Sequence, residues 1–180
     1  MRDFMPDKKK FSLKVLVVGE PAVGKTSVIR RFSDGTFDEN YEHTIGADFN
    51  IKVVEIPEEN VDVILTVWDI GGQERFEVIR KYYYEGSNAA FVVCDLTSKQ
   101  TFAEVNRWYA DLVSYLKDIP IALMANKLDL AESHEVTDKD LEEMVKNLDL
   151  QFYFKTSAKN GTNVHDAFRK IALMCLKGKV

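Results

Sequence analysis

The sequence lacks the disulfide or metal sites that stabilise many small chains, and it lacks a segment that would anchor it in a membrane. It holds two cysteines, Cys94 and Cys175, which are too few for a disulfide framework and do not have metal-ligand spacing. Its longest apolar runs, such as residues 89–94, fall far short of the ~18 residues of a membrane helix. The first residues carry neither a secretory nor a myristoylation signal. We therefore expect two idle thiols in a reducing compartment and a cytoplasmic protein.

An excess of basic residues is also missing. Twenty-nine acidic residues outnumber 24 basic ones, which gives a net charge of −5. This balance argues against a nucleic-acid partner and against general adhesion to anionic membranes. The 180 residues, 46% of them apolar, suit one globular domain. With no linker or repeat in view, we expect an N-terminal tail over residues 1–10, a single domain over 11–180, and a monomer.

Short apolar runs alternate with helical patterns along the chain. Several runs are apolar on both faces, as in a covered parallel sheet. Capping signals at Thr101 with Glu104 and at Thr137 with Asp140 predict two helices, and a third follows Gly161-Thr162. Residues 47–69 predict a hairpin that turns at 57–60 and supplies an antiparallel edge strand. The expected parallel strands are 13–18, 63–68, 89–94, 121–125 and 152–154.

These elements predict a doubly wound α/β fold, with a mostly parallel six-stranded sheet and one antiparallel edge strand. In such sheets, ligands bind beyond the carboxyl ends of the strands. Polar or turn-forming residues follow the predicted parallel strands at Gly19, Asp69, Asp95, Asn126 and Ser157. We expect Asp95 to satisfy loop backbone rather than to perform chemistry.

Residues 19–26, Gly-Glu-Pro-Ala-Val-Gly-Lys-Thr, form the strongest motif. They match G-x-x-x-x-G-K-[ST] between a strand and a helix, which predicts a P-loop NTPase fold. Backbone N–H groups and the helix N-terminus would hold phosphates. Lys25 would reach the β- and γ-phosphates, and the Thr26 hydroxyl would ligate Mg²⁺. The expected nucleotide contacts here are Ala22, Val23, Gly24, Lys25, Thr26 and Ser27.

A second motif begins at Asp69, directly after a predicted strand. Its carboxylate is placed to hold Mg²⁺ through water, because Mg²⁺ keeps most of its hydration. Gly72 offers a backbone N–H to a γ-phosphate, and Gln73 can orient an attacking water, since phosphoryl transfer needs no strong base. We assign the catalytic roles to Gln73, Lys25 and Gly72.

The third motif, Asn126-Lys127-Leu128-Asp129, indicates which base is bound. The Asp129 carboxylate can accept two hydrogen bonds from guanine N1–H and N2–H₂, and adenine offers no such pair, so a buried charge would stay unpaired against ATP. Asn126 can brace the loop, and the Lys127 stem can cover the base. Backbone N–H groups of Ser157, Ala158 and Lys159 would approach the guanine O6.

With these motifs the chain resembles a Ras-superfamily small GTPase of the Rab type over about residues 11–177. Rab-like segments are residues 44–49, 68–69 with 72–76, and 82–86. The resemblance implies that Thr44 ligates Mg²⁺ and senses the γ-phosphate, and that Phe37 packs on the guanine. It implies switch segments at about 34–48 and 70–84, and effector binding through Phe49, Trp68 and Tyr83.

By the same resemblance, the protein would be a switch in vesicle trafficking that binds GTP or GDP with Mg²⁺ and hydrolyses GTP slowly. Effectors would bind the GTP state, an exchange factor would expel GDP, and a GTPase-activating protein would supply a catalytic side chain. Membrane association would need a lipid anchor. No prenylation box is present, because its cysteine would stand at Lys177. Either the chain is cut at the domain end or it is not lipidated, and the sequence leaves both open.

Two residues depart from the family pattern. Pro21 stands where Gly or Ser is usual and removes one N–H donor. Gly71 replaces the usual alanine, which predicts a more permissive second switch. Pro21 keeps open an alternative, a GTP-binding scaffold with little or no hydrolysis. A nucleoside or small-molecule kinase is the other alternative, but the sequence shows no arginine-rich lid.

Overall fold

Six strands form a single mixed sheet in the computed structural model, which describes residues 8–38, 44–71 and 77–177. The strand order is β2-β3-β1-β4-β5-β6. The pair β2 and β3 is antiparallel, and the other neighbours are parallel. The strands are β1 (Lys9–Gly19), β2 (Ala47–Ile56), β3 (Val61–Ile70), β4 (Ala89–Asp95), β5 (Ile121–Asn126) and β6 (Tyr153–Lys155).

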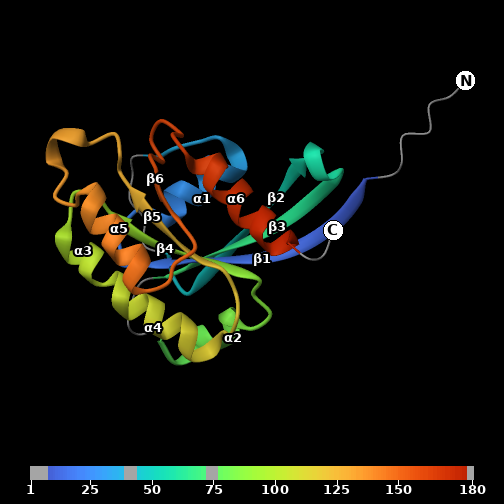
Figure 1. Cartoon of the computed structure of the whole chain (residues 1–180), viewed down its shortest axis with the longest axis horizontal. Helices are drawn as coiled ribbons and strands as arrows, with labels where there is room; N and C mark the ends of the chain where they lie inside the picture. Colours follow the sequence, from blue (N-terminus) through green and yellow to red (C-terminus); the bar gives the residue numbers. More distant parts are fainter. Residues whose placement is uncertain (1–7, 39–43, 72–76, 178–180) are drawn as a thin grey trace, which may run out of the picture.

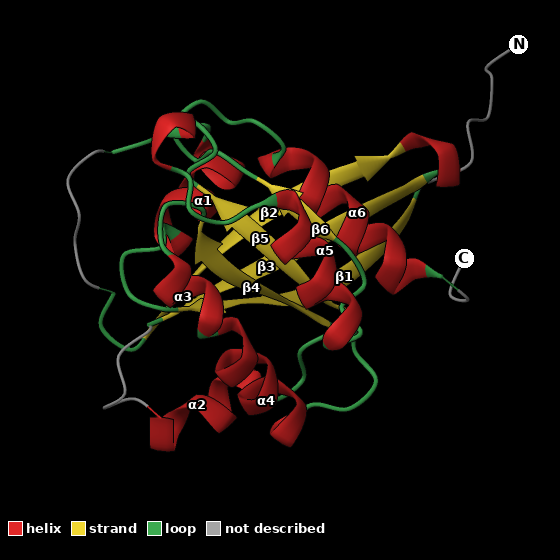
Figure 2. Cartoon of the chain, turned by 60° about the vertical axis from the view of Figure 1, so that its left-hand side comes forward, coloured by secondary structure: helices red, strands yellow, loops and turns green. Residues whose placement is uncertain are grey.

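Helices cover both faces of this sheet (Figure 2). They are α1 (Lys25–Asp34), α2 (Glu77–Tyr84), α3 (Lys99–Ala103), α4 (Val105–Tyr115), α5 (Asp138–Asn147) and α6 (Val164–Leu176). One core lies under α1 and α6, and a second lies under α2, α4 and α5. The doubly wound fold with one antiparallel edge strand is therefore confirmed.

The local signals had mixed outcomes. Thr137 and Asp140 form the predicted capping box of α5. The predicted cap at Thr101 is wrong, because Ser98 caps α3 by accepting from the backbone N–H of Thr101, and α4 begins only after Glu104. The hairpin turns at 57–60 as predicted. Strand β1 starts at Lys9 and so includes the end of the predicted tail, since pairing with β3 extends it.

The parallel strands all end at the same edge of the sheet, on the left of Figure 1. The segments that follow β1, β3, β4, β5 and β6 therefore meet there, as predicted. Among the described residues, no helix is long and apolar enough to cross a membrane. The two thiols, Cys94 and Cys175, are both buried.

Tyr84 ties the end of α2 to α4. Its ring is fully buried, and its hydroxyl donates to Asp111 Oδ2 at 2.7 Å. Burial and, next, this hydrogen bond raise the pKa of the phenol. Asp111 also pairs with the buried Arg80 of α2, with 3.5 Å between nitrogen and oxygen. The position of α2 against the sheet thus depends on a small buried polar cluster.

We expect Tyr84→Phe to lower the free energy of unfolding by about 1–2 kcal/mol at pH 7, because the Asp111 carboxylate loses a donor. A tyrosine in the unfolded chain ionises near pH 10 while Tyr84 stays protonated in the fold. Its contribution is therefore present below about pH 10 and is lost as the pH rises further. In urea titrations, the difference in unfolding free energy between the parent and Tyr84→Phe should become smaller above about pH 10.

Tyr115→Phe is the matched control, since this exposed ring lies beside Tyr84 with 6.0 Å between centroids. It should change the unfolding free energy by less than about 0.5 kcal/mol. If the unfolding free energies of the parent and Tyr84→Phe fall equally with pH above about pH 10, the proposed role of the Tyr84 hydroxyl is wrong.

Candidate nucleotide-binding site

The phosphate motif leaves the sheet at Gly19. A Cβ atom here would lie 2.3 Å from the carbonyl oxygen of Val93 on β4, and φ is +144°, so only glycine fits. The loop then folds around its own lysine, whose Nζ donates to the carbonyls of Gly19 at 2.9 Å and Glu20 at 2.8 Å. Burial lowers the pKa of Lys25 to about 8. The ammonium therefore lies inside the loop, beside the start of α1.

The middle of the loop is conformationally strained. Ala22, next to Pro21, has φ +63°, a left-handed conformation that costs a residue with a Cβ roughly 1–2 kcal/mol. Beyond it, Asn126 Nδ2 donates to the carbonyl of Val23 at 3.0 Å. Such a conformation persists only where surrounding contacts hold it, and the Asn126 bond is one such contact.

Three oxygen-bearing side chains meet beside the loop. Thr26 begins α1, Thr44 lies before β2, and Asp69 lies near the end of β3. The hydroxyls of Thr26 and Thr44 are 2.9 Å apart, both bond Asp69 Oδ2, and the Thr44 bond is 3.2 Å long. Asp69 is 2% exposed, and burial raises its pKa. Among the described residues its Oδ1 has no hydrogen-bond partner, so the cluster has capacity to ligate a cation.

Gly71 brings the segment of Thr44 close to the end of β3. Its N–H donates to the carbonyl of Gly46 at 2.8 Å. An added Cβ would lie 2.8 Å from the carbonyl oxygen of Thr44 and 2.9 Å from that of Gly46. The more permissive second switch expected from this glycine stays a prediction, and the contacts show a second role. Gly71 allows two segments to approach more closely than an alanine would permit.

The base-recognition residues form a braced loop at the ends of β5 and β6. Ser157 Oγ donates to Asp129 Oδ1 at 2.6 Å. Asn126 Oδ1 accepts from Thr156 Oγ1 at 3.3 Å and from the N–H of Ala158 at 3.2 Å. Asn126 therefore links this loop to the phosphate loop, and its predicted bracing is present in the structure.

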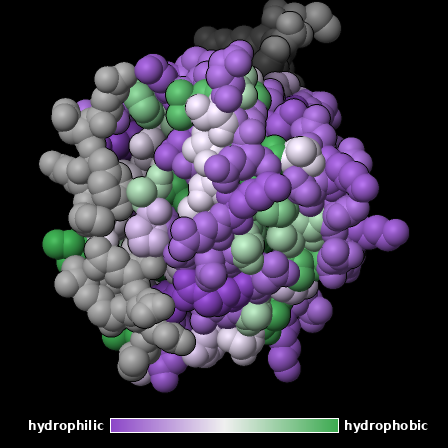
Figure 3. Space-filling view, turned by 90° about the vertical axis from the view of Figure 1, so that its left-hand side faces the viewer, coloured by the Kyte–Doolittle hydropathy of each residue, from purple (hydrophilic) through white to green (hydrophobic). Residues whose placement is uncertain are grey.

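The remaining predicted residues divide into three groups. Phe49, Trp68 and Tyr83 form a contiguous aromatic row, with ring centroids 5.4 Å and 6.1 Å apart. Phe37 packs against the core under α1 and α6. Gly72 and Gln73 lie outside the described residues. Hydrophilic residues make up most of the coloured surface at this edge, which Figure 3 shows face on.

Comparison with known proteins bears on this arrangement. The model of the Ras family matches residues 14–177. The chain belongs to the Ras family. Rab-32B of Dictyostelium discoideum is 41% identical over 89% of the chain and 63% of its own length. Rab-1 of Theileria parva is 38% identical over 94% and 76%, and human Rab-30 is 39% identical over 90% and 79%. The chain thus spans just under two thirds of the Dictyostelium relative, and the expected Rab type within this GTP-hydrolysing family is confirmed.

Contacts that the sequence did not predict also support the site in this Ras-family protein. Arg31 of α1 donates from Nε to the carbonyl of Ala158 at 2.7 Å and also bonds the carbonyl of Lys159. Lys127 Nζ pairs with Asp95 Oδ2 at 2.6 Å, while Asp95 Oδ1 accepts from the N–H of Thr97. The backbone role predicted for Asp95 is confirmed, and its ion pair with Lys127 is an addition.

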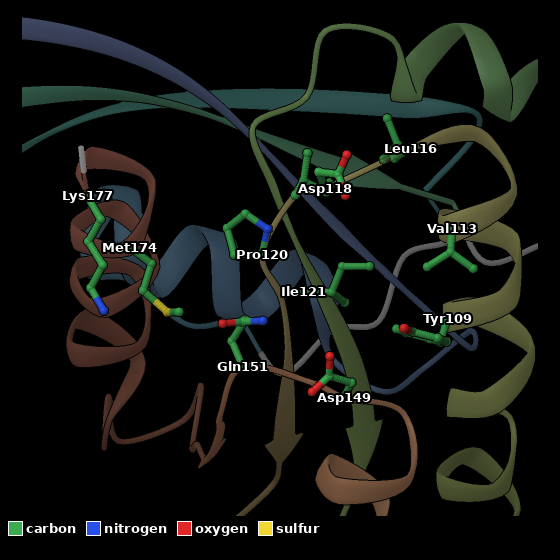
Figure 4. Close-up of a pocket in the computed structure, with 11 residues that line it drawn as sticks. Tyr109, Val113, Leu116, Asp118, Pro120, Ile121, Asp149, Gln151, Met174 and Lys177 are labelled. Atoms are coloured by element: carbon green, nitrogen blue, oxygen red, sulfur yellow. The ribbon is translucent and has the colours of Figure 1, made fainter. Parts of the chain in front are cut away.

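A separate pocket of about 530 Å³ lies at the opposite edge of the sheet. Figure 4 shows Tyr109 and Val113 of α4 facing Met174 and Lys177 at the end of α6, with Pro120 at the start of β5 between them. Because it borders the amino ends of β5 and β6, this pocket is not part of the nucleotide site.

We expect Asn126→Ala to lower the free energy of unfolding by about 2–4 kcal/mol, because buried groups on two loops lose their partners together. Urea unfolding of the nucleotide-free protein measures the change. Asn106→Ala is the control, since its exposed side chain donates to the carbonyl of Ala103 at 3.0 Å in its own helical region. If both substitutions change the unfolding free energy equally, the hydrogen bonds of Asn126 to the two loops do not stabilise the fold.

Proposed function

We propose that the chain is a nucleotide-controlled switch that binds GTP or GDP with Mg²⁺ and hydrolyses GTP slowly in a Rab-like trafficking role. The observation that carries the proposal is the convergence of Thr26, Thr44 and Asp69 beside the Lys25 loop. An oxygen cluster thus lies next to the loop that we propose to hold the phosphates, and Asn126 joins that loop to the segment that we propose to recognise guanine.

The oxygen cluster fits Mg²⁺. Mg²⁺ takes oxygen ligands and keeps several waters, and the buried carboxylate of Asp69 has an oxygen to spare. Thr26 and Thr44 would hold the ion directly, and Asp69 would hold it through water. When bound, the ion neutralises charge on the β- and γ-phosphate oxygens.

Within this proposal Lys25 stabilises the phosphates, Gly72 donates an N–H to the γ-phosphate, and Gln73 orients the attacking water. Contacts of Thr44 and Gly72 with the γ-phosphate would order the two switch segments, and hydrolysis would release them. Effectors would read the ordered state at Phe49, Trp68 and Tyr83. An exchange factor and a GTPase-activating protein would set the rates, and a lipid anchor would carry the protein to a cytosolic membrane face.

Guanine selectivity should depend on Asp129. We expect Asp129→Ala to weaken GTP binding by about a hundredfold and to leave weak ATP binding nearly unchanged, because only guanine offers the donor pair. Competition of GTP and ATP against a fluorescent guanine nucleotide measures both affinities. Glu132→Ala, an exposed acidic residue on the same loop, should retain the parent's selectivity. A parent that prefers ATP would refute the guanine assignment.

Pro21 favours a second candidate, a GTP-binding scaffold without turnover. The proline removes an N–H donor from the loop, and the neighbouring Ala22 is held at φ +63°. A stiffer loop beside the γ-phosphate can slow hydrolysis or impair the fit of an activator's arginine. The two candidates differ only in whether bound GTP is cleaved.

Single-turnover hydrolysis separates them. We expect the parent to convert bound GTP to GDP slowly with Mg²⁺, and both Gln73→Leu and chelation by EDTA to suppress this. Pro21→Gly should change the rate with or without an activator, because it restores an N–H and flexibility. No conversion by the parent would favour the scaffold, and equal rates for the parent and Pro21→Gly would exclude an effect of the proline.

A further inference from the structure

The second residue of the phosphate loop is tethered to a distant helix. Glu20 Oε1 accepts a hydrogen bond from Trp108 Nε1 of α4 at 2.8 Å, and the same oxygen pairs with the Arg107 guanidinium. The backbone carbonyl of Glu20 meanwhile accepts from Lys25 Nζ. One residue therefore connects α4 to the ammonium inside the loop.

The attachment point on α4 is a buried side chain. Trp108 is 1% exposed, and the Arg80 guanidinium lies over its ring at 4.7 Å from the centroid. A buried indole N–H requires an acceptor, and Glu20 provides one. Arg107 is partly exposed and also pairs with Glu104 on its own helix, so solvent weakens its share of the tether.

The tether and the Asn126 bond bracket the strained part of the loop. Glu20 fixes the chain before Pro21, and Asn126 fixes it after Ala22 through the carbonyl of Val23. Without the first fixed point, Ala22 could relax from its left-handed conformation. Its N–H and that of Val23 would then turn away from the position that phosphate oxygens require.

We propose that Glu20 is a positioning residue for nucleotide binding, which holds the Pro21-Ala22 segment in its phosphate-binding conformation by anchoring it to Trp108 and Arg107. This inference rests on the proposed binding of guanine nucleotide. Simple electrostatics predicts the opposite effect, because removing a carboxylate near the phosphates would strengthen their binding. A loss of the positioning contact would weaken nucleotide binding, whereas the loss of the negative charge alone would strengthen it. The direction of the change in binding therefore distinguishes the two effects.

Release of a fluorescent GDP from the full chain, with Mg²⁺ and excess unlabelled GDP, tests the proposal. We expect Glu20→Ala to accelerate release about tenfold, as the loss of a charged hydrogen bond predicts. Glu20→Gln keeps an acceptor for Trp108 and should stay within about threefold of the parent. Glu104→Ala removes the other carboxylate from Arg107 without touching the loop, and it should release GDP at the parent's rate.

A second substitution tests the strain directly. Glycine adopts a left-handed conformation without cost, so in an Ala22→Gly background the added Glu20→Ala should accelerate release by less than about threefold. A purely structural role for Glu20 would give the same factor in both backgrounds. If Glu20→Ala accelerates GDP release by the same factor in both backgrounds, or does not accelerate it in the parent, this inference is wrong but the proposed function still stands. A parent that does not retain GDP would overturn the proposed function and this inference with it.

Discussion

The close approach of Gly19 to the carbonyl of Val93 is the constraint on which the nucleotide edge depends. Strands β1 and β4 pair in parallel up to this point, and a side chain at position 19 would collide with the neighbouring strand. The chain can therefore turn sharply across the strand ends and enclose Lys25. Displacing Gly19 would move the loop, the start of α1 and the Thr26 hydroxyl together.

Two buried charged side chains, Lys25 and Asp69, lie at this edge. Burial lowers the pKa of Lys25 and raises that of Asp69, so the charged form of each is disfavoured where it lies. An anionic phosphate beside Lys25 and a cation beside Asp69 would each stabilise the charged form of that side chain. Any ligand that binds only the folded state also stabilises that state. The fold thus carries local electrostatic costs that a nucleotide with its metal ion would offset.

Sequence rules succeeded where a residue's role follows from local pattern. The strand-end rule located Asp69 and Asn126, and a capping box located the start of α5. They failed at Thr101, because Ser98, three positions earlier, also has a capping side chain and is the residue that caps α3. The Thr101 hydroxyl instead accepts from the N–H of Asp95. Sequence patterns also did not show that Gly71 lies close to residues 44–46, because that approach is visible only in the tertiary structure.

The residues that sequence analysis missed share a physical property. Arg31 and Glu20 act on loops through partners 127 and 88 positions away, and those partners are set by how α1 and α4 pack on the sheet. Motif residues must match the ligand, so their types and spacing are fixed by its chemistry. Residues such as Arg31 and Glu20 need only form a hydrogen bond or ion pair with a side chain or backbone group on a neighbouring element. Many pairs of residue types can do so. The support of the phosphate loop can therefore differ between relatives with the same motif, which permits a proline and a strained alanine in this chain.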